Sequence, residues 1–457
     1  MRSVWVVASF GLIAAAAAGC APQSGTTVAL ADPEASNPYH CADIFAPDLL
    51  PTFEITIAPD DWSALKSEYA DWKARQDQNL DLKPYHPITF KYGGEVIDDA
   101  YIKLQGNPSS AWTGDKMEFT VAFDKVYPDH RFHGLKKVVF HAPASDRTFL
   151  RERLAQAYER ALGLPAACEN NSRLVVNGAF YGIYANREAP DSVYVMRVFP
   201  EGPGGDMWKG GWQLDNGKVT QNAAGHDQLM QLKPGDVATL KSLVDIDELI
   251  ADWAAEAMMP DNDGYWAVDH NFYIYDHPTR GFLWLPYDLD ATFDFVEFGA
   301  DPITWVPYWS NGWGVHQQIV MADPDLVQRF VAALQKAHDA YDVNLLMARL
   351  ESWEVQIASS VDADHVKPFS TADHQLAVST MDNYFYLRDR YVASWLDCWK
   401  NDSGEDADGD GFIWCHDCDD HNPAINPNAV EICGNDVDEN CNGRKDDCGT
   451  GGSSTSP

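Results

Sequence analysis

The pattern of apolar positions changes character near residue 235 of this 457-residue chain. Before that point, short runs rich in aromatic and branched side chains alternate with turn-forming residues, which is typical of β-strands. After it, apolar residues recur every three or four positions, which is typical of amphipathic α-helices. This helical spacing covers 237–258, 324–341, 343–360 and 372–398. The sequence therefore predicts an α+β fold, strand-rich first and helical afterwards.

Two apolar runs interrupt the helical part and predict a buried β-hairpin. FYIY at 272–275 and FLWL at 282–285 are separated by the turn-forming HPTRG. Carboxylate and amide oxygens held on a rigid hairpin suit a hard cation such as Mg²⁺, which usually takes its remaining ligands from phosphates and water. The hairpin therefore points to phosphoryl transfer, although an isolated Asp-x-Asp pair more often begins a solvated turn. The polar side chains beside it are Asp263, Asp269, Asn271, Asp288 and Asp290.

The amino terminus carries the pattern of a bacterial lipoprotein signal. Arg2 is followed by an apolar run that ends in Ala-Ala-Gly-Cys20. Cleavage before Cys20 and acylation of its thiol would tether the mature chain to a membrane by lipid. We expect 1–19 to be a signal peptide and 20–40 a linker. The predicted location is the bacterial cell envelope, extracytoplasmic, on the periplasm-facing outer membrane or the cell surface.

The cysteines agree with export, because they remain even in number once Cys20 is set aside. Disulfides are the default state for exported cysteines. Five of the remaining eight lie between 415 and 448, so one of these five must pair outside that segment. Cys398 is the predicted outside partner, which leaves Cys41 to pair with Cys168.

The segment after residue 400 contains two acidic loops with calcium-site spacing. Positions 1, 3, 5 and 12 of each loop carry oxygen ligands, and position 7 donates a carbonyl in the first. Gly411 holds position 6 of the first loop, whereas Cys441 stands there in the second. We expect residues 401–448 to form a disulfide-braced Ca²⁺ module and 449–457 a flexible tail. The predicted ligands are Asp406, Asp408, Asp410, Phe412 and Asp417, then Asp436, Asp438, Asn440 and Asp447.

The net charge of the chain argues against some classes of binding partner. The formal net charge is −36, with 69 acidic and 33 basic residues. Such a balance argues against nucleic acids and against anionic membrane surfaces as partners. It also favours cations at the acidic loops, since bound cations would relieve the repulsion there.

Several segments in a fixed order resemble the CotH kinase-like family, the atypical kinases named after a spore-coat protein. FEITIAPDDWSAL resembles the family's first strand and helix, and NGAFYGIY resembles a hairpin that ends in an acidic residue. HNFYIY and PYDLD resemble its metal-binding hairpin. The resemblance implies a two-lobed kinase-like domain over 41–400, with a strand-rich first lobe. The matching segments are 53–65, 101–125, 146–165, 173–191 and 270–290.

The resemblance also implies roles for individual residues. A turn at 106–110 would offer backbone and hydroxyl groups to the phosphates of ATP, with Lys116 adding a positive charge. Glu188 would hold Lys116 by an ion pair. Asp263 would accept the proton of the acceptor hydroxyl. The turn residues are Gly106, Asn107, Ser109 and Ser110, and the ligands of Mg²⁺ or Mn²⁺ are Asn271, Asp288 and Asp290.

The sequence departs from the family pattern at three positions. Gln105 and Tyr287 replace other expected residues, and Pro108 removes one N–H from the turn. Asp263 stands eight residues before Asn271, a longer spacing than in protein kinases. Asp269 and Asp261 are therefore alternatives for the base, and Lys116 and Glu188 are alternatively two unrelated surface charges.

The segment after 400 resembles the metal-binding motif of the copper-binding MopE type. Copper prefers imidazole, thioether or thiolate ligands. Only His416 and His421 lie nearby, so calcium is the preferred ion. The predicted function is Mg²⁺-dependent transfer of phosphate from a nucleoside triphosphate to a hydroxyl of an envelope protein. The alternative is a catalytically inactive binding or scaffold protein with structural metal sites.

Overall fold

The computed structural model describes residues 40–445 except 110, 113, 143, 144, 203, 212, 215–221, 308, 311, 442 and 444. The predicted signal peptide and Cys20 lie outside the described residues. So do Ser110, which was predicted to bind phosphate, and Asp447, which was predicted to bind Ca²⁺. The described residues belong to one compact unit.

Seven strands form a closed barrel in the order β1-β2-β3-β4-β5-β7-β6. All neighbours are antiparallel except β1 and β6, whose parallel pairing closes the barrel. Alternating burial along β1 reflects the period of two expected for a strand with one face on a core. The strands are β1 Thr52–Thr56, β2 His86–Tyr92, β3 Glu95–Leu104, β4 Phe119–Ala122, β5 Lys137–His141, β6 Glu169–Val176 and β7 Ala179–Glu188.

A second, four-stranded sheet contains the predicted hairpin and has the order β11-β10-β8-β9. Phe272 pairs with Pro286 and His277 with Gly281, so the hairpin prediction is confirmed to within two residues at each strand end. Its apolar runs are fully buried, which explains their continuous hydrophobicity. The strands are β8 Met207–Lys209, β9 Gln213–Leu214, β10 Phe272–His277 and β11 Gly281–Pro286.

Helices dominate the second half, as the periodicity predicted. Aspartates at Asp245, Asp323 and Asp342 accept hydrogen bonds from the first turns of α7, α10 and α11, which explains where these helices begin. Ser370 and Asp373 form a reciprocal capping box at the start of α12. The later helices are α5 Ala223–Met230, α6 Val237–Leu243, α7 Ile246–Met258, α8 Tyr265–Val268, α9 Val315–Met321, α10 Pro324–Ala340, α11 Val343–Ala363 and α12 Thr371–Asn401.

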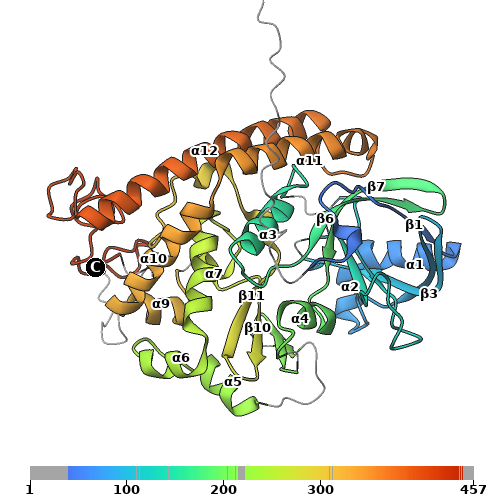
Figure 1. The fold of residues 1–457 in the computed structure, drawn as a ribbon, viewed down its shortest axis with the longest axis horizontal. Coiled ribbons are helices and arrows are strands. Elements are labelled where there is room, and N and C mark those ends of the chain that lie inside the picture. Colours follow the sequence, from blue (N-terminus) through green and yellow to red (C-terminus); the bar gives the residue numbers. More distant parts are fainter. Residues whose placement is uncertain are drawn as a thin grey trace, which may run out of the picture. The chain divides into compact units, whose positions relative to one another are not determined.

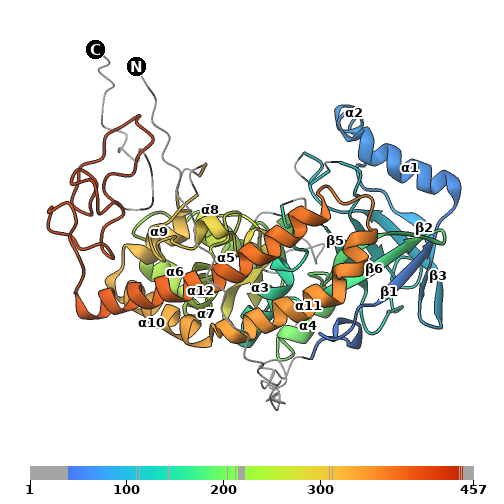
Figure 2. The same ribbon diagram turned by 90° about the horizontal axis from the view of Figure 1, so that it is seen from above.

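The long helices α11 and α12 pack side by side, and α12 leads into the acidic tail (Figure 1). Viewed from above, α1 lies beside the barrel strands β2 and β3 (Figure 2). α3 packs against β6 and against the short turn that carries Asp290. The earlier helices are α1 Pro59–Ala70, α2 Trp72–Asp77, α3 Arg151–Ala161 and α4 Ser192–Val198, and the 3₁₀ turns are η2 Asp43–Phe45, η3 Leu289–Ala291 and η4 Phe295–Glu297.

The disulfide predictions are confirmed where the structure describes both partners. Cys41 pairs with Cys168, and Cys398 pairs with Cys415 in the tail. Cys418 pairs with Cys441 within the tail. The mixed fold and the disulfide-rich tail are therefore confirmed, whereas closure of the strand-rich part into a barrel was not expected. None of the helices that the structure describes is long and apolar enough to span a bilayer.

Candidate functional site

Four adjacent barrel strands present polar side chains on their outer face. Thr120 pairs across the sheet with Lys103 and with Val139, and Val139 pairs with Arg187. Side chains alternate along a strand, so Glu118 shares the face of Thr120, and His141 shares the face of Val139. The intervening residues Phe119 and Phe140 belong to the hydrophobic core. The barrel therefore presents a row of charged and polar groups next to its own core.

Asp288 follows β11 and lies against this polar face. Its Oδ1 is 3.4 Å from His141 Nε2 and accepts a 3.1 Å hydrogen bond from the Arg187 guanidinium. Glu152, from α3, contacts the same two cations: its Oε2 is 2.8 Å from His141 Nδ1, and its Oε1 pairs with Arg187. Ligand atoms of His141, Glu152 and Asp288 all lie within 4.8 Å of one another. Two carboxylates and two cations thus form one buried network.

The charges in this network control which groups stay ionised. Burial alone would raise the pKa of Asp288, but His141 and then Arg187 bring that pKa below its ordinary value. Burial would lower the pKa of His141, and the charges of Glu118, Asp288 and Glu152 raise it well above its ordinary value. Asp288 is therefore held as a carboxylate at neutral pH.

A second group of acidic residues lies beyond Asp288, and fewer positive charges offset their negative charge. Burial and the charge of Asp288 raise the pKa of Asp290 to about 8, although Ser145 Oγ donates to its Oδ2 at 2.6 Å. Burial also raises the pKa of Asp261, together with the charges of Asp290, Asp263 and Asp288. The Oδ2 of Asp261 is buried without a hydrogen-bond partner. Crowded carboxylates with an orphaned oxygen fit a divalent cation, which would lower all of these pKa values.

Asn271 and Asp263 lie together at the open end of the hairpin. The Asn271 amide donates to Asp263 Oδ2 at 3.0 Å, and His270 Nδ1 is 3.1 Å from Asp263 Oδ1. Phe272 pairs with Pro286, so the register sets Asn271 opposite the Tyr287–Asp288 segment. Asn271 and Asp288 both have positive φ angles, +52° and +65°. The hairpin therefore brings these predicted residues to one edge in a strained backbone, as is common at functional sites.

The three candidates for the base differ in access. The Asp263 side chain is 43% exposed. Asp261 is buried, and its Oδ1 accepts a hydrogen bond from the Asp263 backbone N–H. Asp269 is exposed and lies beside Gly314. Asp263 is the one that combines access to solvent with direct contact to Asn271.

The predicted phosphate turn begins at Gly106 and lies next to the acidic network. Gly106 has φ +83°, and a Cβ there would come within 2.8 Å of Glu118 Oε2. Asn107 Oδ1 accepts hydrogen bonds from the N–H and hydroxyl of Ser109, so these groups stabilise the turn itself. Gln105 donates to the Tyr287 hydroxyl at 3.2 Å, which ties the turn to the segment holding Asp288.

The predicted ion pair between Lys116 and Glu188 is wrong. Lys116 is buried and pairs with Asp364, and its ammonium lies 4.3 Å from the centre of the Tyr184 ring. Glu188 pairs with Arg197 at 2.6 Å. Lys116 lies against Gly182 on β7, and six residues of strand separate Gly182 from Glu188, roughly 20 Å. Lys116 also has no access to a ligand.

Four residues of the network were not singled out from the sequence: Glu118, His141, Glu152 and Arg187. Arg187 immediately precedes Glu188, but successive strand side chains point to opposite faces, so Arg187 faces Asp288 and Glu188 does not. Charged residues at the two ends of an otherwise apolar strand, as in KVVFH, were the available signal.

The first acidic loop of the tail has the form of a cation site. Asp406 accepts hydrogen bonds from the N–H groups of Gly409 and Gly411, which curls the loop around its carboxylates. Oxygens of Asp406, Asp408 and Asp410 lie within 4.8 Å of one another. The buried oxygens without a hydrogen-bond partner include one each from Asp408, Asp410 and Asp417.

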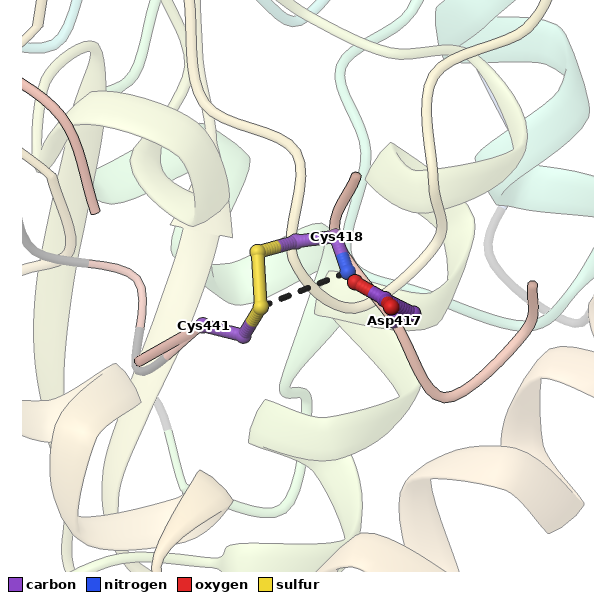
Figure 3. Close-up of side chains that lie close together, drawn as sticks. All are labelled: Asp417, Cys418 and Cys441. Atoms are coloured by element: carbon purple, nitrogen blue, oxygen red, sulfur yellow. Dashed lines mark hydrogen bonds between the residues drawn. A yellow bond between two sulfur atoms is a disulfide. The ribbon is translucent and has the colours of Figure 1, made fainter. Parts of the chain in front are cut away.

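Asp417 lies next to the disulfide between Cys418 and Cys441 (Figure 3). The Cys441 sulfur accepts a hydrogen bond from the Cys418 backbone N–H. Bonded sulfurs are poor metal ligands, so the carboxylate is the ligand group here. Burial, then Asp410, Asp408 and Asp420, raise the pKa of Asp417 to about 6. Asp420 is thus a further acid of this site that the sequence reasoning missed.

The second loop is described only in part, because Asp447 lies outside the described residues. Asp438 Oδ2 accepts a 2.8 Å hydrogen bond from the Gly443 N–H, and Asn440 Oδ1 is buried without a partner. Cys441 has φ +53° at the position where the first loop has Gly411. The disulfide to Cys418 holds it there.

The tail is attached to the helical body by more than its disulfide. Trp399 of α12 lies 4.4 Å from the His416 ring, centre to centre. The Trp313 backbone N–H donates to the Gly443 carbonyl at 2.8 Å, and a Cβ at Gly443 would overlap the Trp313 ring. Trp313 in turn packs against Trp266, three residues after Asp263. The tail is therefore packed on the domain rather than tethered to it.

Comparison with known proteins gives two family matches. A family described as CotH kinase protein matches residues 102–392. A second family, described as "Putative metal-binding motif", matches residues 417–447. A search of curated proteins found no significant match.

Proposed function

Because the chain belongs to the CotH kinase protein family, we propose that it transfers phosphate from a nucleoside triphosphate, ATP being the expected donor, to a hydroxyl of a protein. The barrel would act as the first lobe of a kinase-like pair and the helical part as the second. The site would lie where the polar barrel face meets the open end of the β10–β11 hairpin.

The observation that carries this proposal is the hairpin register, which sets Asn271 opposite the Tyr287–Asp288 segment, with Asp290 two residues further on, beside a buried carboxylate network. These residues would hold Mg²⁺ or Mn²⁺, together with phosphate oxygens and water. When bound, the ion would neutralise negative charge on the transferred phosphoryl group. His141 and Arg187 keep Asp288 ionised and oriented for that role.

Asp263 is the proposed base. Its carboxylate is accessible and is positioned by Asn271 and His270, so it can take a proton from an acceptor hydroxyl that enters from solvent. Asp261 would position the Asp263 backbone and, through its orphaned oxygen, add charge to the cation site. Proximity of base and metal ligands is what an in-line transfer requires.

The first test is calorimetric titration of the full chain without its signal peptide, using ATP with Mg²⁺ or with chelator. We expect heat only with Mg²⁺, and loss of that heat in Asp288→Asn. Asp276→Asn, at the other end of β10, is the matched control and should bind as the wild type does. Equal heats for wild type and Asp288→Asn would refute the metal assignment.

Transfer of labelled phosphate to a serine-rich test peptide then tests the base. Asp263→Asn should bind ATP and Mg²⁺ normally but lose transfer by about 10²-fold or more. Normal transfer by that variant would move the role to Asp261 or Asp269.

We further propose that Cys20 is lipidated, which would anchor the chain in the cell envelope where its protein acceptor lies. Support comes from the Ala-Ala-Gly-Cys20 pattern. Cys20→Ser should leave an unprocessed precursor that takes up no labelled fatty acid. Acylation of that variant would overturn the proposal.

The tail is proposed to bind Ca²⁺ rather than copper. Support comes from three carboxylates with orphaned buried oxygens and from the spacing of the ligands, which is that of an oxygen-ligand site. The His416 ring packs against Trp399, and its Nε2 lies 3.7 Å from Asp402 Oδ1.

A second candidate function is non-enzymatic binding of an envelope component. A groove of about 680 Å³ beside α1 is lined by aromatic rings, most of them half-buried, whose faces suit sugar rings as well as apolar peptides. Soluble peptidoglycan fragments are the probe, with Trp72→Ala as the variant. Binding that is lost in Trp72→Ala, together with no nucleotide binding in the first test, would favour this function. The aromatic residues are Trp62, Tyr69, Trp72, Trp112, Phe180 and Tyr181.

A further inference from the structure

The burial of Lys116 leaves the proposed phosphate site without the lysine that the family resemblance assigned to it. Asp364 neutralises Lys116 within the core, under the Tyr184 ring. A polyphosphate next to Asp288 and Asp290 would still need positive charge beyond that of the metal ion. This positive charge would have to come from other lysines near the hairpin.

Lys209 lies beside the segment that carries Asp288. It is the last residue of β8, and it pairs across the sheet with Tyr273 of the hairpin. Its ammonium is 4.8 Å from the centre of the Tyr287 ring, and Tyr287 immediately precedes Asp288. Lys209 is exposed, so a ligand can reach it.

Lys83 approaches the same place from the barrel side. Its ammonium lies 6.0 Å from the centre of the Trp112 ring. The Trp112 indole N–H donates to the Gln105 carbonyl at 2.5 Å, and the Gln105 amide donates to the Tyr287 hydroxyl at 3.2 Å. A continuous set of contacts thus links Lys83 to the ring on which Lys209 lies.

Lys103 completes the group. It lies on the outer face of β3, two residues before Gln105, opposite Thr120. Thr120 Oγ1 donates to Gln105 Oε1 at 2.9 Å, which places Lys103 on the polar face described above. The three lysines come from a loop, a barrel strand and the second sheet, so tertiary packing alone brings them together.

Convergence of three like charges is costly and points to an anion. Burial, then the charges of Lys209 and Lys103, lower the pKa of Lys83 to about 8. Among the described residues, no carboxylate forms an ion pair with Lys83. The charge of Glu118 opposes this shift in the pKa of Lys83, and burial raises the pKa of Glu118 itself. Three ammonium groups gathered beside the Gly106 turn and the Tyr287 ring favour a negatively charged ligand.

We propose that Lys83, Lys103 and Lys209 form a phosphate subsite between the Gly106 turn and Asp288, and that it holds the polyphosphate chain of the donor nucleotide. The identification of the ligand as a nucleotide rests on the proposed function, whereas the anion subsite does not. Phosphate is equally the chemistry of a phosphorylated product. The position next to the Asp288–Asp290 edge favours the donor, because the donor's phosphates must meet the metal ion.

The experiment is calorimetric titration of the full chain with three probes in Mg²⁺ buffer: ATP, inorganic tripolyphosphate and a phosphoserine peptide. The variants are Lys209→Met and Lys83→Met, with Lys91→Met on β2 as the matched control. We expect ATP and tripolyphosphate each to bind about tenfold more weakly to either variant, the usual effect of losing a bond to a charged group. Lys91→Met should bind as the wild type does. Lys209→Arg should retain most of the affinity, because it retains the charge.

Wild-type affinity for ATP in both Lys209→Met and Lys83→Met would overturn the subsite while leaving the proposed function intact. Tripolyphosphate binding that depends on the lysines, with no binding of ATP, would support the subsite and refute the nucleotide donor. Lysine-dependent binding of the phosphoserine peptide alone would overturn the assignment to the donor. Because Lys209 is exposed, its variant tests the proposal even if Lys83→Met fails to fold.

Discussion

Lys116 and Asp364 show how a buried charge is held at the level of single residues. Asp364 follows α11 and accepts hydrogen bonds from the N–H groups of Ile183, Val366 and Lys367. Lys116 pairs with the same carboxylate, yet burial lowers the pKa of Lys116 to about 8. The pair joins the segment before β4 to the end of α11, so it connects the barrel with the helical part.

Removing one partner of this pair should destabilise the protein strongly. Lys116→Met leaves Asp364 buried without a cation, and we expect the free energy of unfolding to fall by about 3 kcal/mol. Lys116→Met combined with Asp364→Asn should recover part of that loss, since no charge remains unpaired. Denaturant unfolding measures both values. Lys241→Met, which breaks a half-exposed pair with Asp323, should cost less than about 1 kcal/mol and serves as the control.

A single histidine should give the protein part of its acid sensitivity. His316 is buried, and its Nδ1 lies 2.6 Å from the Tyr265 hydroxyl, while Nε2 lies 3.3 Å from the Leu229 carbonyl. Burial lowers the pKa of His316 to about 4, below the ordinary 6.5. As pH falls from 6.5 towards 4, the unfolded chain therefore binds the proton first, and stability is lost in that window.

The loss attributable to His316 should reach about 3 kcal/mol at pH 4 and be negligible above pH 7. His316→Gln keeps a group able to hydrogen bond but cannot titrate. The difference between wild type and variant in free energy of unfolding, measured from pH 7 to pH 4, isolates the effect from other acids. A difference that does not change with pH would show that His316 is not buried in its neutral form.

At the level of elements, the β10–β11 hairpin holds the site, and its turn depends on one glycine. Gly281 begins β11 with φ +86°, and a Cβ there would come within 2.4 Å of the Leu243 carbonyl oxygen. Backbone cannot move aside as a flexible side chain can. The residue therefore combines a left-handed conformation with a close approach of α6 to the hairpin.

Gly281→Ala should cost about 3 kcal/mol of stability, the upper part of the range for a strained residue, because the clash adds to the strain. Gly93 is the matched control: it has φ +57° but open space around it, so Gly93→Ala should cost only about 1 kcal/mol. Thermal and denaturant unfolding compare the two. Equal losses would mean that α6 does not approach the hairpin this closely.

For the whole molecule, the acidic tail and the domain should be stabilised together. The tail contributes Gly443 and His416 to contacts with Trp313 and Trp399, and Cys415 bonds it to α12. If calcium orders the tail, it should also reinforce these contacts. Ligands that bind only the folded state stabilise it by mass action.

We expect millimolar calcium to raise the melting temperature by a few degrees and to slow hydrogen exchange within residues 401–441, because extracellular calcium sites saturate at about 10⁻⁴ to 10⁻³ M. Asp408→Asn should weaken both effects, whereas Asp397→Asn on α12 should not. Stabilisation by copper and not by calcium would show that the ion was misassigned.

The sequence was sufficient to predict those features of the fold that depend on local patterns or on residue counts. The β10–β11 hairpin, three of the four long helical segments and the Cys41–Cys168 and Cys398–Cys415 bonds were predictable, because strand and helix periods and cysteine parity are local or countable properties. The fourth segment, 237–258, is divided into α6 and α7 at Val244 and Asp245. The placement of Asn271 opposite the Tyr287–Asp288 segment followed from the hairpin register. The sequence also suggested the acidic loops of the tail, through their regular spacing.

Only the tertiary structure decided which charges meet. Glu188 and Arg187 are adjacent in the chain, yet the alternation of strand side chains sends Arg187 to Asp288 and Glu188 to Arg197. Lys116 meets Asp364 across 248 residues. Closure of the barrel is likewise a long-range pairing, of β1 with β6. Ion pairs and barrel closure depend on register, face and packing between distant segments, and local sequence patterns do not encode these.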